Sequence, residues 1–455
     1  MMTMTERPST ASMPPPPSAD GIHTTEGVDA LVWAAVAERS SGDHRAKMAK
    51  YQQALAHASE LGDVARHLLL GLVNLDTGKP DKALPHLEQA AALNPGEALN
   101  DLFLGQAQTQ LGRYDLALQN FQRCQQLDPQ CTGVHHSIGM VHALLGDHDT
   151  SIHYHRRELQ KNELLMESAF QMVEARQMQF AHRHGRRAES FAELANQLYL
   201  DRLARGLFAE RDSEGDPSLV SLAYDKCGTH LIADVLQALT GQRSNWAYHE
   251  DPNPLNRFPE PVPSGEFVAG NWYPHDHFVS RILGDRSRVV LQYRDPRDAA
   301  VSGYFYCHKP EVLVSDSVFA KAVRGAEKGP GILYILEQWS NAILHWAVLW
   351  MEARVPLYIS TFEDIVNHKA QSTARIARYL GVVDDEAAIQ RVVAQTAFKK
   401  RSASLVTENL SENFKRKGQS GDWRNHFTPE MIDYARFKVG RSLVSLGYEQ
   451  DPNWS

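Results

Sequence analysis

Three short stretches of the chain combine cationic side chains with glycine or serine at spacings that suit the binding of an anion. They span residues 224–231, 293–302 and 415–427. In the last of them three cations directly precede Gly418, and Gly421 follows. Glycine lets the main chain approach a ligand closely, and Arg and Lys supply charge-assisted hydrogen bonds. A single basic run is ordinarily a solvated surface loop, but three such stretches in one chain favour an anion site.

The first stretch combines a strand, a tight loop and a helix. Residues 218–224 form an apolar run typical of a buried strand, and Thr229 opens an amphipathic helix that Gly241 ends. Main-chain N–H groups and the helix dipole then point at a phosphate, which Lys226 neutralises. The alternative for this stretch alone is a plain turn between a strand and a helix. The Walker pattern is absent, which argues against an NTPase loop and a nucleotide kinase.

In this order the three stretches resemble the cofactor-binding segments of the cytosolic-type sulfotransferases, which use 3′-phosphoadenosine 5′-phosphosulfate (PAPS). The resemblance covers residues 218–448. It implies that the first loop binds the 5′-phosphosulfate and that Lys226 is catalytic, because its ammonium bridges towards the leaving oxygen. The loop residues that the resemblance assigns to cofactor binding are Lys226, Cys227, Gly228, Thr229 and His230. Of these, Cys227 replaces a Ser of the family and His230 a Thr, while Leu231 replaces a Trp.

The same resemblance implies the remaining contacts to PAPS. It implies that the 3′-phosphate is bound by Arg294, Ser302, Arg416, Lys417 and Gly418. It also implies that the adenine is contacted by Phe362, Thr396 and Phe398. Ser302 follows Arg294 by eight residues, as in the family. A planar, bidentate Arg suits a phosphate. The alternative is that Arg294 and Arg297 only pair with Asp295 and Asp298 on the surface.

A second apolar strand is expected at residues 288–293, and the family places a His, the general base, just before it. The corresponding segment here spans residues 270–277, and aligning its proline puts Trp272 at the expected position. His275 and His277 lie close by, and we favour His275 as the catalytic base. A His whose pKa is near neutrality suits deprotonation of a hydroxyl. A metal site at this His-x-His pair is the alternative, but the family needs no metal and none is expected.

The N-terminal half contains an internal repeat of 34 residues. The recurring positions are Gly71, Gly105 and Gly139, then Gly78, Gly112 and Gly146, and also Ala83, Ala117 and Ser151. This period is typical of tetratricopeptide (TPR) repeats, helix–turn–helix units that stack and expose a groove for a peptide or a partner protein. A structural spacer or a dimerisation arm is the alternative use of such repeats.

These observations predict the organisation of the chain. We expect a disordered segment at residues 1–27, TPR repeats at 28–166, a helical connector and linker at 167–217, and a sulfotransferase domain at 218–455. The fold class is an N-terminal all-α TPR solenoid followed by an α/β domain. That domain should contain a mostly parallel sheet flanked by helices, with a P-loop-like turn that binds phosphate.

The amino-acid composition argues against two classes of partner, nucleic acids and membranes. Lys and Arg number 47 against 55 Asp and Glu, a net charge of −8, which argues against nucleic-acid binding. The N-terminal residues 1–20 lack the apolar core of a signal peptide, and the apolar stretch at residues 342–351 is too short to span a bilayer. We therefore expect a cytoplasmic protein without a membrane partner.

The predicted function is transfer of a sulfuryl group from PAPS to a hydroxyl or amine acceptor, releasing adenosine 3′,5′-bisphosphate. The acceptor is a small molecule, a saccharide or a peptide. The alternative is a TPR adaptor whose second domain binds a nucleotide without catalysis. Residues that keep the spacing of the family's dimer signature imply a weak homodimer; they are Arg424, Thr428, Pro429 and Asp433.

Overall fold

The structure is a computed structural model. It describes residues 30, 32–34, 36, 44–161, 166–208, 218–245, 265–274, 279–280, 282, 287–308, 318–382, 385–397 and 418–454. The chain divides into two compact units, which lie within residues 4–183 and 184–455. Each unit is treated by itself below.

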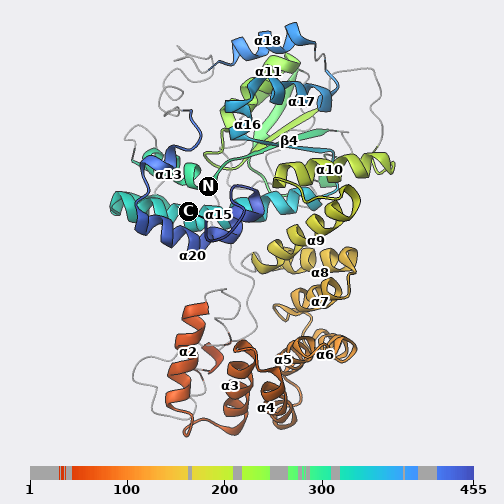
Figure 1. Ribbon diagram of the computed structural model, residues 1–455, viewed down its shortest axis with the longest axis vertical. Coiled ribbons are helices and arrows are strands. Elements are labelled where there is room, and N and C mark those ends of the chain that lie inside the picture. The colour runs from red at the N-terminus through yellow and green to blue at the C-terminus, as the bar shows by residue number, and fades with distance from the viewer. Residues whose placement is uncertain are drawn as a thin grey trace. The chain divides into compact units, whose positions relative to one another are not determined.

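The first unit consists of helices joined by short turns (Figure 1). They are α2 (His44–Ala56), α3 (Asp63–Asp76), α4 (Pro80–Leu93), α5 (Ala98–Gln110), α6 (Tyr114–Leu127), α7 (Val134–Leu144), α8 (His148–Lys161) and α9 (Met166–His184). Pairs α3 and α4, α5 and α6, and α7 and α8 each occupy one 34-residue period, which confirms the predicted repeat of helical hairpins.

Small residues recur where the two helices of each hairpin cross. A Cβ on Gly71 would lie 2.5 Å from the Leu87 side chain, and one on Gly105 would lie 2.4 Å from the Phe121 ring. A Cβ on Gly139 would likewise lie 2.8 Å from the ring of His155. These distances are shorter than van der Waals contact, so the repeating glycines permit the close helix pairing that buries each hairpin's apolar side.

The predicted connector at residues 167–217 divides between the two units. Helix α9 ends at the boundary, whereas α10 (Phe191–Ala204) belongs to the second unit. The Asn196 side chain accepts from the main-chain N–H of Ile359 at 2.7 Å and donates to its carbonyl at 2.8 Å. Arg202 donates to the carbonyl of Met351 at 2.7 Å. Helix α10 is therefore part of the α/β unit.

The second unit is built on a parallel sheet with the strand order β2-β3-β1-β4-β5. The strands are β1 (Leu219–Ala223), β2 (Arg243–Asn245), β3 (Glu266–Gly270), β4 (Arg288–Tyr293) and β5 (Leu357–Thr361), and every pairing is parallel. All five residues of β1 are buried, as its apolar sequence predicts for a strand covered on both faces. The chain leaves β1 towards β2 on one side and leaves β4 towards β5 on the other. This is a topological switch point, at which α/β proteins bind ligands.

Helices cover both faces of the sheet, and Figure 1 shows α11, α17 and α18 on one side and α15 and α20 on the other. The helices after β1 are α11 (Thr229–Thr240), α13 (Pro296–Cys307), α14 (Val318–Gly325), α15 (Lys328–Glu352), α16 (Phe362–Asn367), α17 (Lys369–Leu380), α18 (Glu386–Gln395) and α20 (Pro429–Leu446), with a 3-10 turn η4 (Asp422–Asn425). Side chains of β1, β3 and β4 share an apolar core with α11 and α16–α18, and a second core lies among α13, α14, α15 and α20. The predicted α/β fold with a parallel sheet flanked by helices is confirmed.

None of the described helices combines the length and the apolar character that a membrane crossing requires.

Candidate active site

The loop between β1 and α11 has a backbone that few residue types adopt. Lys226 has a φ of 60° and Gly228 a φ of 90°, both in the left-handed region. A Cβ on Gly228 would lie 2.6 Å from the Gln292 amide nitrogen and 2.6 Å from the Phe362 ring. Glycine is thus required there by conformation and by space. Thr229 then begins α11, so the positive end of the helix dipole lies at this loop.

Gln292, a polar residue within the apolar strand β4, holds the loop between β1 and α11 in place. Its amide nitrogen donates to the carbonyl of Cys227 at 2.6 Å and to that of Gly228 at 3.1 Å. The Cys227 side chain is fully buried, and burial raises the pKa of its thiol. Cys227 therefore fills space beneath the loop as a neutral side chain, and a contact to a ligand would come from its main chain.

Arg294 joins the three predicted stretches. From the end of β4 its guanidinium donates to the carbonyl of Gln419 at 2.9 Å and to that of Lys226 at 3.5 Å. It lies 3.5 Å from the carboxylate of Asp298. Gln419 directly follows Gly418, whose φ is 63°. The structure thus brings Lys226, Arg294 and Gly418 to one place at the carboxyl ends of β1 and β4.

Asp298 holds the third stretch against α13. Its carboxylate accepts from the main-chain N–H of Gly421 at 2.6 Å and from that of Trp423 at 2.8 Å. The exposed fractions of Arg294, Asp298 and Arg297 are 6%, 0% and 2%. The pairs of the alternative do form, Arg294 with Asp298 and Arg297 with Asp295. They are buried, however, so the expectation that they lie on the surface is wrong.

Glu363, on the first turn of α16, supports the same region. Its carboxylate accepts from the main-chain N–H of Asp295 at 3.2 Å and from the Tyr448 hydroxyl at 2.8 Å. Burial, followed by the neighbouring Asp295 carboxylate, raises the pKa of Glu363 to about 7. Sequence reasoning missed Gln292, Asp298 and Glu363 as parts of the site. The sequence signal that could have indicated them is a polar side chain within or shortly after an apolar strand.

The Lys226 ammonium lies over the ring of Tyr306, with Nζ 4.0 Å from the ring centroid. Tyr306 is on α13, one helical turn after Ser302, and both residues are half-buried. Residues four apart lie on the same side of a helix. One side of α13 therefore carries both a predicted phosphate contact and the ring next to the predicted catalytic lysine.

Phe362 and Thr396, assigned to the adenine by resemblance, are both buried. The Phe362 ring lies under the Arg294 guanidinium, and the Thr396 hydroxyl donates to the carbonyl of Val392 at 2.7 Å within its own helix. Lys369 also donates to the carbonyl of Thr396. The structure thus gives Phe362 a role in packing between the first and second predicted anion-binding stretches.

The segment predicted to hold the base is described only up to Pro274. Trp272, which aligns with the family's His, packs its ring against Gly270, and its carbonyl accepts from the indoles of Trp346 and Trp350 at 2.8 Å each. The predicted residues His275, His277, Phe398, Arg416 and Lys417 lie outside the described residues. Within the described part of the chain, no group of three or more His, Cys, Asp or Glu side chains could hold a metal ion.

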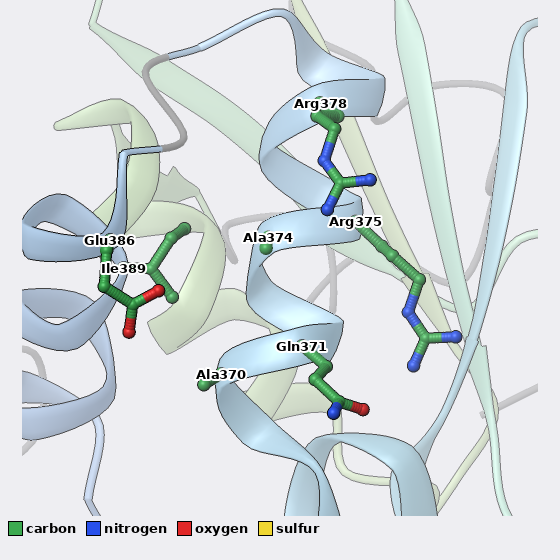
Figure 2. A pocket seen from close by; sticks show the side chains of 7 residues that line it. All are labelled: Ala370, Gln371, Ala374, Arg375, Arg378, Glu386 and Ile389. Atoms are coloured by element: carbon green, nitrogen blue, oxygen red, sulfur yellow. The ribbon is translucent and has the colours of Figure 1, made fainter.

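A surface hollow of about 610 Å³ lies elsewhere in this unit, between α17 and α18. Figure 2 shows Arg375 and Arg378 projecting from α17 at its edge. The lining contains none of the loop residues described above. It is therefore separate from the candidate active site.

Comparison with known proteins identifies both parts of the chain. Residues 216–440 match the family model of the sulfotransferase domain, and residues 74–147 match that of the tetratricopeptide repeat. The chain carries a sulfotransferase domain preceded by TPR repeats. The chain therefore belongs to the class of enzymes that transfer sulfuryl groups. The matched residues include β1, β4 and β5, the three strands that carry the candidate site.

Curated relatives of the sulfotransferase domain include Sulfotransferase 2B1 of Homo sapiens, 24% identical over 266 residues, which cover 52% of this chain and 70% of that protein. A 3-alpha-hydroxysteroid sulfotransferase of Cavia porcellus is 23% identical over 237 residues, covering 47% and 79%. Among solved structures, a mouse sulfotransferase complexed with PAP has a TM-score of 0.39 at 17% identity, covering 54% of this chain and 91% of that one.

Proposed function

We propose that the sulfotransferase domain transfers a sulfuryl group from PAPS to a hydroxyl or amine acceptor and releases adenosine 3′,5′-bisphosphate. The observation that carries this proposal is the position of Arg294, whose guanidinium contacts both the Lys226 loop and the loop at Gln419. A nucleotide with phosphates at its 5′ and 3′ positions needs two anion sites side by side.

The residues present fit such a ligand. Gly228, with a φ of 90°, lets the loop turn directly into the N-terminus of α11, where main-chain N–H groups and the helix dipole favour an anion. The Nε of Arg294 is buried and has no hydrogen-bond partner among the described residues. Buried polar groups in a native protein are otherwise almost always paired, so this donor favours an anion next to Arg294.

Bound PAPS would supply an activated sulfuryl group. Lys226 would stabilise the charge that develops on the leaving phosphate oxygen, and a preorganised cation acts on such charge without reorganisation. Arg294 and the loop at Gly418, together with Arg416, Lys417 and Ser302, would hold the 3′-phosphate, which does not react. His275 or His277 would accept the acceptor's proton.

Radiolabelled sulfate transfer from PAPS to a phenol, with titration of adenosine 3′,5′-bisphosphate, tests the proposal. Lys226→Ala should lower turnover by about two to three orders of magnitude, as for loss of one transition-state donor, with little change in nucleotide affinity. Arg294→Ala should instead weaken nucleotide binding. The matched control is Arg375→Ala, an exposed Arg of the same unit beside the separate hollow.

The outcomes distinguish the enzyme from its alternative. An adaptor with an inactive domain would bind the nucleotide through Arg294 but transfer no sulfate to any acceptor. If wild-type protein neither binds the nucleotide nor transfers sulfate, the proposal is wrong.

We also propose that the TPR repeats bind a partner protein, or a peptide that is itself the acceptor. Stacked helical hairpins offer a surface separate from the predicted cofactor contacts, all of which follow residue 218. Sulfate incorporation into a host extract, followed by mass analysis of the labelled product, would identify the acceptor. A weak homodimer through residues 424–433 remains part of the proposal and is tested by sedimentation at several concentrations.

A further inference from the structure

The contact between Lys226 and Tyr306 crosses from one predicted anion-binding stretch to the helix that follows another. Lys226 lies in the loop after β1, and Tyr306 lies on α13 after β4. The ammonium nitrogen is 4.0 Å from the ring centroid, which is the geometry of a cation–π interaction. This contact is not implied by any of the sequence motifs.

A lysine in this loop needs help to hold one position. Its side chain has four flexible carbons and loses considerable rotamer entropy when fixed. Its backbone already has a φ of 60°, a conformation that residues other than glycine rarely adopt. The negative face of an aromatic ring can hold the ammonium in place while leaving its N–H groups directed elsewhere, and does so more strongly where water is partly excluded.

The tyrosine is suited to this role as a neutral ring. Burial raises the pKa of the Tyr306 hydroxyl, and the neighbouring Asp225 carboxylate raises it further. Its ring is fixed on α13, whose first turn is capped by the Asp295 side chain. Because Ser302 lies one turn earlier on the same helix, binding of a phosphate there and the position of Lys226 depend on one rigid element.

We propose that Tyr306 is a positioning residue for Lys226: the face of its ring holds the ammonium beside the phosphate-binding loop, ready for the oxygen that leaves during sulfuryl transfer. The inference rests on the proposed function for the step itself. The contact between the two side chains can be tested without any cofactor.

Reductive ¹³C-methylation of the lysines in the full chain, followed by NMR, measures the contact directly. Methyl groups above an aromatic ring are shifted upfield, and the Lys226 signal is assigned by its loss in Lys226→Arg. We expect the upfield shift to persist in Tyr306→Phe and to vanish in Tyr306→Leu. The matched control is Tyr304→Leu, which removes a ring of equal size from the same helix but should leave the Lys226 shift in place.

Kinetics then show what the contact does. In Tyr306→Leu we expect kcat to fall about threefold to tenfold, the range that a cation–π contact provides, while the affinity for adenosine 3′,5′-bisphosphate stays within about twofold. Tyr306→Phe should recover most of the loss. A purely structural defect would lower nucleotide affinity as well and would not be rescued by Phe.

Two results would overturn the inference. One is an unshifted Lys226 signal in the folded wild-type protein. The other is a rise in the KM for the acceptor in Tyr306→Leu with kcat unchanged, which would assign the ring to acceptor binding. An upfield Lys226 signal in a protein that transfers no sulfate would leave the contact standing and refute the proposed function instead.

Discussion

The guanidinium of Arg294 lies over the ring of Phe362, with its central carbon 4.1 Å from the ring centroid. The edge of the same ring would touch a Cβ on Gly228. Phe362 therefore lies between the loop of the first predicted anion-binding stretch and the arginine of the second. It sets the spacing between the two, which a ligand with two phosphate groups would have to match.

Replacing Phe362 should weaken binding through the 3′-phosphate. Phe362→Leu removes the stacking surface of Arg294, worth about 1 kcal/mol or slightly more at a desolvated site. We expect a fivefold to tenfold weaker affinity for adenosine 3′,5′-bisphosphate and little change for adenosine 5′-phosphate, measured by calorimetry. An equal loss for both nucleotides would show that Phe362 acts through the loop at Gly228 or through the adenine, and not through Arg294 alone.

Replacing Gly228 should damage the phosphate loop. In Gly228→Ala the new methyl meets Gln292 and Phe362 at 2.6 Å, in addition to the strain of a φ of 90°. The control is Gly241→Ala, because Gly241 has a similar φ of 73° but open space around it. We expect the first variant to lose nucleotide binding and more thermal stability than the second. Similar melting temperatures would contradict the crowding.

Protonation of Glu363 should make stability depend on pH near neutrality. Its pKa is about 7 in the folded protein against an ordinary 4.5, so its contribution to stability is complete below pH 4.5 and is lost as the pH rises through 7. In Glu363→Gln this decline between pH 5 and 8 should flatten, as seen in thermal melts. Exposed Glu430, whose pKa is lowered, stays ionised throughout that range, so Glu430→Gln should follow the wild type.

The limits of the folded α/β unit can be tested by truncation. A chain of residues 184–455 keeps α10 and the two hydrogen bonds of Asn196 to Ile359 on the edge strand β5. A chain of residues 218–455 lacks α10, so it exposes the edge of β5 and the apolar side chains that α10 covers. Such an exposed edge favours aggregation. We expect only the longer chain to be monodisperse with a cooperative thermal transition. Equal behaviour of the two chains would show that α10 is dispensable.

Adding a methyl group at a helix crossing should destabilise the repeats. Alanine normally stabilises a helix by about 1 kcal/mol relative to glycine, but in Gly105→Ala the methyl meets the Phe121 ring at 2.4 Å. We therefore expect a lower melting temperature for Gly105→Ala, and no such loss for Gly96→Ala, where the space is open. A higher melting temperature for Gly105→Ala would mean that the two helices can move apart without loss of stability.

The sequence by itself determined what depends on neighbouring residues. The 34-residue period predicted the helical hairpins, and the apolar run at residues 218–224 predicted β1, followed by α11, which Gly241 ends. These features follow from local periodicity and from backbone conformations that only certain residues favour. The same local patterns placed Lys226 and Arg294 in loops that follow strands, and Gly418 in a basic loop.

Tertiary structure alone decided which distant groups meet. Asp298 binds the N–H groups of Gly421 and Trp423, more than a hundred residues away, and Lys226 meets Tyr306. It also decided that α10 belongs to the α/β unit, although its sequence reads only as a helix. No local pattern encodes such partners, because burial of a charge or a ring is settled by all the elements that pack around it.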